Sequence, residues 1–171
     1  WPLDGQAVSA SKWSRSCMIT IRKLNFLTDC YRDFAGDIQA ILDELYEVSP
    51  WTFEQTFADL LREETVYYLA FSEDQKVLGF LALSVVMDEI EITNIAVAKA
   101  YQSQGIASIL LKQLAELDGK IFLEVRASND KARRLYEKFE FEAYYQRKDY
   151  YQNPQEDAIL MKREKWQNII Y

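Results

Sequence analysis

The first half of the chain alternates between short strand-like and helix-like runs of apolar residues. Residues 19–24 (ITIRKL) alternate apolar and polar side chains, and this period of two predicts a strand. A period near 3.6 follows and predicts an amphipathic helix, whose apolar face consists of Ile38, Ile41, Leu42 and Leu45. We expect that helix to end before Ser49 and Pro50, because proline cannot continue a helix.

Thr52 and Gln55 predict the start of a second helix, since threonine followed three residues later by glutamine is typical of a capping box. Large apolar side chains recur at helical spacing after this start, and we expect one shared, packed face formed by Phe53, Phe57, Leu60 and Leu61. Core packing explains this face without any functional role.

Three strand-like runs come next, at residues 66–71, 77–87 and 90–97. The polar segment SEDQK joins the first two, and Asp88 with Glu89 turns the chain into the third. Because short connections join antiparallel strands, we expect these three strands to be antiparallel neighbours.

The pattern changes at Gly105. Residues 105–117 repeat apolar side chains at helical spacing, and residues 120–127 (KIFLEVRA) again look like a strand. A strand, a helix and a strand in succession predict a right-handed crossover, which makes the two strands parallel.

A further helix is expected over residues 129–139, with Ser128 or Asn129 as its N-cap. Two strands, 141–151 and 157–164, follow around a turn at Gln-Asn-Pro-Gln. The sequence shows no internal repeat and no low-complexity linker. The fold class expected is therefore α/β in the mixed α+β sense, in a single domain over residues 18–171. Residues 1–17 have no clear period, and we expect either an added leader before Met18 or a natural surface extension.

Composition narrows the range of possible partners and locations. Lysine and arginine number 20 and aspartate and glutamate 27, which gives a net charge of −7. This charge argues against direct nucleic-acid binding and favours a basic partner. No apolar run reaches the roughly 20 residues that span a bilayer, and the start does not have the order of a signal peptide. We expect a cytoplasmic protein without a membrane partner.

The chain contains no histidine. A Ser-His-Asp site, a Cys-His site and a histidine-ligated zinc are thereby excluded. Any acid or base must come from Asp, Glu, Lys, Tyr or Cys. Cys17 and Cys30 form no closely spaced metal or redox pattern, so we expect no metal.

The segment from Tyr101 to Ala107 (YQSQGIA) lies between a predicted strand end and a predicted helix start. Backbone N–H groups and the positive end of the helix dipole meet at such a place and attract phosphate. Gly105 and the small Ala107 would let a ligand approach the backbone. Alone, the pattern is a weak signal, and an ordinary strand-to-helix turn that contains a glycine is the better interpretation.

Several segments in chain order add context: MDEIEITNIAV, YQSQGIASILL, LEVRASN, ARRLYEKFEF and RKDYYQNPQEDAILM. Together they resemble the GCN5-related N-acetyltransferase superfamily over residues 18–164. They are most similar to the bacterial branch that acetylates the N-terminal alanine of a small-subunit ribosomal protein. The resemblance implies a mostly antiparallel mixed sheet flanked by helices, with a parallel strand-helix-strand site for acetyl-CoA as cosubstrate.

The resemblance also implies catalytic roles. Glu124 corresponds to the base that takes the amine proton, although a strand glutamate paired with Arg126 is the structural alternative. Alternation places Phe122, Glu124 and Arg126 on one face of their strand. Tyr136 corresponds to the general acid, and its alternative is a buried helix tyrosine.

Other residues correspond to binding positions of the superfamily. Those expected to contact the cofactor are Ile95, Ala96, Val97, Gln102, Ser103, Gln104, Gly105, Ile106, Ala107, Asn129 and Tyr136. Four further residues match segments beside the peptide groove, although aromatic side chains are more often part of the core: Trp51, Glu89, Tyr150 and Tyr151. A basic cluster could meet the 3′-phosphate, although a solvated helix face is the better reading of Lys131, Arg133 and Arg134.

Two departures from the superfamily leave the acceptor open. Glu140 stands where a glycine is usual, so we expect the preceding helix to lose its left-handed cap and end differently. The stretch from Gly105 to Glu124 is also short. The expected function is acetyl transfer to the N-terminus of a basic ribosomal protein by a monomer or weak dimer. The alternatives are acetylation of lysine side chains or small amines, and a CoA-binding module without catalysis.

Overall fold

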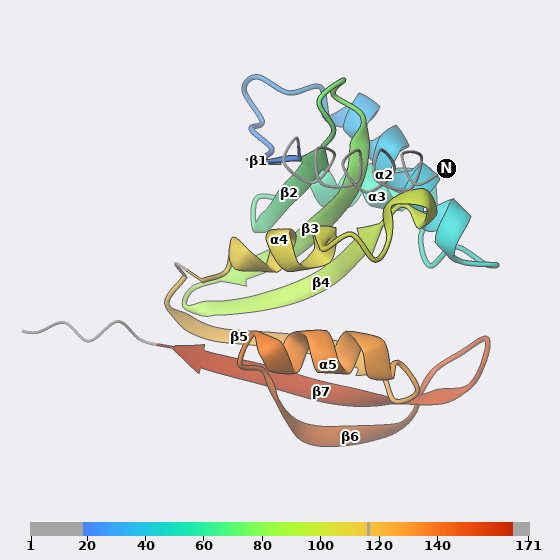
Figure 1. The fold of residues 1–171 in the computed structure, drawn as a ribbon, viewed down its shortest axis with the longest axis vertical. Helices are drawn as coiled ribbons and strands as arrows, with labels where there is room; N and C mark the ends of the chain where they lie inside the picture. The colour runs from blue at the N-terminus through green and yellow to red at the C-terminus, as the bar shows by residue number, and fades with distance from the viewer. Residues whose placement is uncertain (1–18, 116, 166–171) are drawn as a thin grey trace, which may run out of the picture.

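A computed structural model describes residues 19–115 and 117–165 of the chain. The expected leader, residues 1–17, and Met18 lie outside the described residues. The elements follow one another (Figure 1) as β1 Thr20–Lys23, α2 Tyr31–Leu45, α3 Phe53–Leu60, β2 Thr65–Phe71, β3 Val77–Val86, β4 Glu89–Val97, η1 Lys99–Tyr101, α4 Ile106–Lys112, β5 Gly119–Arg126, α5 Asp130–Lys138, β6 Glu142–Tyr151 and β7 Glu156–Lys165.

One seven-stranded sheet has the order β1-β2-β3-β4-β5-β7-β6. Strands β2, β3 and β4 are successive antiparallel neighbours, as their short connections predict. The pair β4 and β5 is parallel, with α4 in the crossover between them, and β7 inserts antiparallel between β5 and β6. The prediction of a mixed, mostly antiparallel sheet with one parallel strand-helix-strand unit is confirmed.

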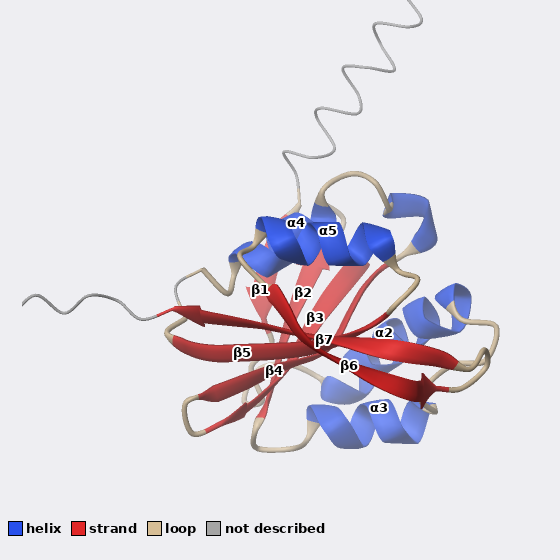
Figure 2. Ribbon diagram, turned by 90° about the horizontal axis from the view of Figure 1, so that it is seen from below, coloured by secondary structure: helices blue, strands red, loops and turns tan. Residues whose placement is uncertain are grey.

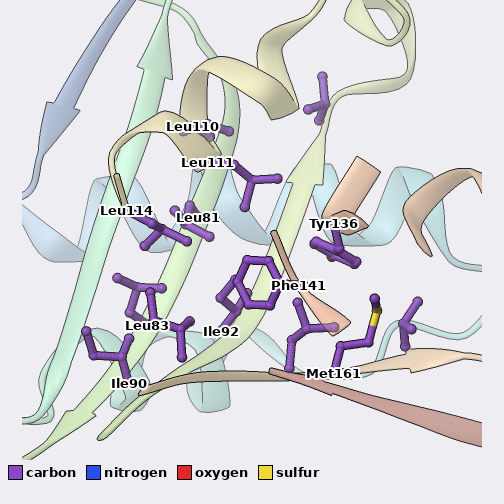
Figure 3. Close-up of a cluster of buried hydrophobic side chains, with 14 of the residues drawn as sticks. Leu81, Leu83, Ile90, Ile92, Leu110, Leu111, Leu114, Tyr136, Phe141 and Met161 are labelled. Atoms are coloured by element: carbon purple, nitrogen blue, oxygen red, sulfur yellow. The ribbon is translucent and has the colours of Figure 1, made fainter. Parts of the chain in front are cut away.

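Helices cover both faces of the sheet. Figure 2 shows α4 and α5 on one side and α2 with α3 on the other. The first side holds a core cluster that joins Leu110 and Leu111 of α4 to Phe141 and Met161 (Figure 3). The second cluster includes Ile38 and Leu42 of α2, which the helical period placed on the buried face. No helix in the described part of the chain is long and apolar enough to cross a membrane.

Helix α3 begins with the capping box that the sequence predicts. The backbone N–H of Gln55 donates to Oγ1 of Thr52, and the Gln55 side chain accepts from the Thr52 N–H at 2.9 Å. The prediction of one packed face is wrong at Leu61, which is 48% exposed. Leu61 is the C-cap of α3, where the chain leaves the helix, so its side chain no longer follows the helical face.

Helix α4 is shorter than the pattern predicts: it ends at Lys112 and not at Leu117. Beyond Lys112 the backbone tightens into i→i−3 bonds, such as Leu114 N–H to Leu111 O at 3.0 Å. The buried Arg163 of β7 donates to the carbonyl oxygen of Leu114 at 2.8 Å, which holds this irregular end in place.

The end of α5 also differs from expectation. Glu140 adopts the left-handed φ of 69° that the usual glycine would take. The N–H of Phe141 donates to Tyr136 O at 3.1 Å and that of Glu140 to Glu137 O at 3.0 Å. These two bonds make a Schellman motif, so the prediction that the helix loses its left-handed cap is wrong. The burial of Phe141 against Tyr136, with ring centroids 6.0 Å apart, enforces this conformation without a glycine.

Candidate active site

The site begins where β4 and β5 part. The two parallel strands pair only from Glu89 to Glu91 on β4 and from Lys120 to Phe122 on β5. Beyond these pairs, β4 continues to Val97 alongside β3, with a bulge in the β3–β4 register after Ala82. The free edges of β4 and β5 therefore face an opening between them, and a ligand can reach their backbone groups there.

A cleft of about 1100 Å³ occupies this opening. That volume is slightly above the range of about 300–1,000 Å³ that is usual for small-molecule sites. It is lined by nearly all of the residues expected to contact the cofactor: Ile95, Ala96, Val97, Gln102, Ser103, Gly105, Ile106, Ala107, Asn129 and Tyr136. The exception is Gln104, which does not line the cleft.

The loop before α4 has the geometry of a phosphate-binding turn. Gly105 is the N-cap with φ 82°, and Ser103 also has a positive φ of 63°. The Gln102 amide donates to the carbonyl oxygen of Val97 at 3.1 Å, which ties the loop to the end of β4. A Cβ on Gly105 would meet nothing within 4 Å, so the backbone is open to a ligand on that side. These features fit an anionic pyrophosphate group.

The three basic residues near the start of α5, Lys131, Arg133 and Arg134, do not all line the cleft. Lys131 lines the cleft and donates from Nζ to Oγ of Ser103 at 3.4 Å, and Arg134 lines the cleft as well. Arg133 does not line it, and its guanidinium lies 3.8 Å from Asp130. Lys131 thus lies beside the predicted phosphate loop, and the exposed Arg134 adds a second cation to the same cleft, which suits an anionic cofactor. Asn129 caps α5 by accepting from Ala132 N–H at 3.1 Å, so its side chain has the capping role that the sequence left open.

Glu124 lines the cleft from β5. The burial of β5 alternates along the strand, and Phe122, Glu124 and Arg126 lie on its more exposed face, as predicted. The Arg126 guanidinium lies 3.3 Å from Glu156 and donates to the carbonyl oxygen of Gln152 at 3.0 Å. Arg126 is thus held by the turn between β6 and β7. A hydrogen bond from Tyr150 to the Glu124 carboxylate raises the pKa of Tyr150.

Tyr136 lines the cleft from α5 and is 7% exposed. Burial raises the pKa of its phenol well above the usual range, and the neighbouring Tyr46 and Tyr151 raise it further. The hydroxyl therefore stays protonated at any physiological pH and can donate a hydrogen bond or a proton. Its ring packs edge-to-face against Phe141, so the side chain is fixed (Figure 3).

Three of the four residues expected beside the peptide groove also line the cleft, namely Trp51, Tyr150 and Tyr151. Burial, followed by the charge of Glu124, raises the pKa of Tyr151 to about 12. Glu89 lies at the opposite end of β4, beside Lys120, and does not line the cleft.

Sequence reasoning missed Tyr46, which lines the cleft directly after the last residue of α2. Its only signal is its position in the short connection that also contains Trp51. Among residues 19–115 and 117–165, no group of three or more acidic, cysteine or histidine side chains is arranged to hold a metal ion.

Comparison with known proteins agrees with this geometry. The family model described as the acetyltransferase (GNAT) family matches residues 27–141. The chain belongs to the GNAT family. It is therefore an acetyl-CoA-dependent N-acetyltransferase. The GNAT family uses acetyl-CoA. In this chain the cleft lies at the point where the parallel strands β4 and β5 part.

Two relatives of this GNAT domain carry the same name. This chain is 40% identical over 121 residues to the ribosomal protein bS18-alanine N-acetyltransferase of Escherichia coli, and the match covers 66% of this chain and 79% of that protein. The protein of the same name from Haemophilus influenzae is 35% identical over 133 residues, covering 70% and 89%. The crystal structure of the Escherichia coli enzyme superposes with a TM-score of 0.74 at 30% identity, covering 90% of this chain and 99% of that one.

Proposed function

We propose that this enzyme acetylates the N-terminal α-amino group, beginning with alanine, of a small-subunit ribosomal protein. The proposal rests on one observation above others: Glu124 and Tyr136 line the same cleft from β5 and α5. Relatives named for alanine N-acetylation of ribosomal protein bS18 supply the acceptor. The net charge of −7 suits the basic N-terminal segment of such a protein.

Acetyl-CoA, when bound, supplies the thioester whose carbonyl carbon is attacked. The residues of the chain handle the protons. Glu124 takes a proton from the attacking amine, directly or through water, as the new C–N bond forms. Tyr136 donates its hydroxyl hydrogen to the leaving sulfur as the C–S bond breaks. One proton is thus taken and one is given, and no covalent enzyme intermediate is needed.

An α-amino group suits this arrangement better than a lysine side chain. With a pKa near 8, about a tenth of α-amino groups are neutral at pH 7, whereas a lysine near 10.4 is neutral in only about 0.04% of copies. An α-amine is therefore in its reactive, neutral form far more often than a lysine amine, and a base has to remove a proton from it less often. The raised pKa of Tyr136 keeps the acid protonated throughout this pH range.

A blocked-peptide experiment tests the acceptor. The enzyme and acetyl-CoA are incubated with a peptide that begins with alanine and contains an internal lysine, with its α-amino group either free or blocked. Mass spectrometry of fragments should locate one acetyl group on the free α-amine and none on the blocked peptide. Acetylation of the blocked peptide at a similar rate would assign the enzyme to lysine acceptors.

A further inference from the structure

The connection from α2 to α3, residues 46–52, forms one wall of the cleft. Five of its residues line the cleft: Tyr46, Val48, Ser49, Pro50 and Trp51. Within the described part of the chain, residues 47–51 make no hydrogen bond from backbone to backbone. Ordering a segment without such bonds costs conformational entropy that its own backbone does not repay. The position of this wall therefore depends on side-chain contacts.

Gln39, a buried polar residue of α2, supplies such contacts. It is 8% exposed. Its Nε2 donates to the carbonyl oxygen of Trp51 at 2.6 Å and lies 3.2 Å from Oγ of Ser49. Its Oε1 accepts from Oγ1 of Thr56 in α3 at 2.6 Å, and Thr56 is fully buried. A single amide thus joins α2, α3 and the segment between them.

The partners of this amide settle its orientation. The carbonyl oxygen of Trp51 has no hydrogen to donate, so the nitrogen of Gln39 must face it. The Asp43 carboxylate, one helical turn further along α2, is a second acceptor at 2.9 Å from Nε2. A contact between the two helices needs only the bond from Thr56. The donor half of the amide reaches beyond the helices and fixes the backbone at Trp51.

This wall suits the acceptor better than the cofactor. The features that suit an anionic cofactor are the loop at Gly105 and the cation of Lys131, which lie on other elements. The connection contains no lysine or arginine and carries the acidic Glu47, so its charge suits a cationic acceptor. After burial, Tyr46 is the next cause of the raised pKa of Tyr136, so the wall lies near the proposed acid.

We propose that Gln39 is a positioning residue for the acceptor: its amide donates to the carbonyl oxygen of Trp51 and so holds the α2–α3 connection where the incoming peptide meets it. The inference rests on the proposed function. Gln39 does not line the cleft, so it acts through Trp51 and not on the substrate itself. Its loss weakens peptide binding and leaves the chemical step to Glu124 and Tyr136.

The first test removes the donor half of the amide against a matched control. Thr56→Val is the control, because it breaks the bond to Oε1 of Gln39 and keeps the shape of the side chain. Gln39→Met in the Thr56→Val background then leaves no unpaired hydroxyl at this contact. From the control to the double variant, the KM of an alanine peptide should rise about tenfold, the equivalent of one hydrogen bond. The kcat should change by about twofold at most, and the Kd for acetyl-CoA should stay the same.

Gln39→Glu provides a second route that keeps the bond from Thr56. Its carboxylate accepts the Thr56 hydrogen but has no N–H for Trp51, so the same rise in peptide KM is expected. A double-mutant cycle supplies a readout that a merely structural residue would not move. In a Trp51→Ala background, Gln39→Glu should raise KM by roughly twofold at most, because the group that it positions is gone.

Several outcomes would overturn the role of Gln39. One is a KM equal to that of the Thr56→Val control, and another is a full tenfold rise in the Trp51→Ala background. Equal weakening of acetyl-CoA and peptide binding, or a fall in kcat at unchanged KM, would also contradict it. Failure of both Gln39 variants to fold, while Thr56→Val folds, would make Gln39 a structural residue only.

The proposed function fails separately. A parent enzyme that acetylates some other amine but not the alanine peptide contradicts the ribosomal acceptor. The same variants are then compared with the amine that the enzyme does accept, because the wall at Trp51 borders the cleft for any acceptor.

Discussion

The two residues proposed for proton transfer, Glu124 and Tyr136, have different surroundings. Glu124 is half-buried on a strand beside a cleft, within reach of Tyr150 and solvent. Tyr136 is buried against Phe141 and its pKa is raised. A base must exchange its proton with solvent after each cycle, whereas an acid must hold its proton until the thiolate develops. The surroundings suit these separate tasks.

Glu124→Gln keeps the size of the side chain and removes the base. We expect kcat at pH 7 to fall by about 10²-fold or more, the scale of a lost general base. Much of this loss should be recovered as pH rises past 8, because the free amine then accumulates without help. Steady-state rates from pH 6 to 9.5 measure this, with acetyl-CoA affinity as the control that should not change. A parallel pH profile in parent and variant would mean that Glu124 only binds or supports structure.

Tyr136→Phe keeps the ring packing on Phe141 and removes the hydroxyl. We expect acetyl-CoA and peptide to bind nearly normally and kcat to fall by about 10²-fold. Because burial raises the pKa of Tyr136, ionisation of this phenol should not reduce the parent's kcat between pH 7 and 10. Titration calorimetry and initial rates separate binding from chemistry. A variant that turns over at the parent rate would contradict the role of Tyr136 as the acid.

Among the elements, α5 joins the predicted cofactor-binding residues to the proposed acid. Its N-cap Asn129 lines the cleft, its first turn holds Lys131 against Ser103 of the loop before α4, and its last turn holds Tyr136. The Schellman motif after Tyr136 fixes that last turn, although Glu140 occupies the left-handed position. A non-glycine residue there costs about 1 kcal/mol or more, so this cap is strained.

Glu140→Gly should relieve this strain. We expect the free energy of unfolding to rise by about 1 kcal/mol, reduced in part by the greater freedom of glycine in the unfolded chain. The melting temperature should rise by roughly 2–4 °C at this chain length. Glu137→Gly, at an exposed position inside the same helix, is the matched control and should lower stability by about 1 kcal/mol. A fall in melting temperature with Glu140→Gly would show that the glutamate side chain itself stabilises the end of α5.

At the scale of the whole molecule, the cleft draws on elements far apart in the sequence. The connection after α2, the end of β4, the loop before α4, β5, α5 and the turn after β6 all contribute to its lining. A ligand bound there contacts both halves of the sheet. Binding must therefore stabilise the entire fold by mass action, and not one segment only.

Acetyl-CoA should accordingly raise the melting temperature, by an amount equivalent to about 2.7 kcal/mol at a hundredfold excess over Kd. Gly105→Val should abolish this protection, because its side chain would project into the open space at the loop and disfavour the φ of 82°. Gly36→Ala is the control: its added Cβ also meets nothing within 4 Å, but it lies on α2 outside the cleft lining. Differential scanning fluorimetry measures both. Equal protection of the parent and Gly105→Val would exclude this loop from the cofactor site.

The sequence by itself determined the features that depend on neighbours along the chain. Side-chain periods predicted the strands and helices, and cap preferences predicted one N-cap at Thr52 and another at Ser128 or Asn129, which the structure assigns to Asn129. The motifs around Glu124 and Tyr136 also identified the family and its cofactor, since they lie in short continuous segments.

Tertiary structure alone decided the features that depend on distant segments. Helix α4 ends early where Arg163, 49 residues from Leu114, donates to its carbonyl oxygen. Glu140 keeps a left-handed cap because Phe141, the next residue, is buried in the core cluster with Leu110 of α4 and Met161 of β7. Glu91 comes next to Phe122 only through the parallel register of β4 and β5. A long crossover, and not a tight turn, connects β4 to β5, and the packing partners of Phe141 and Leu114 come from other elements, so no pattern among neighbouring residues encodes these features.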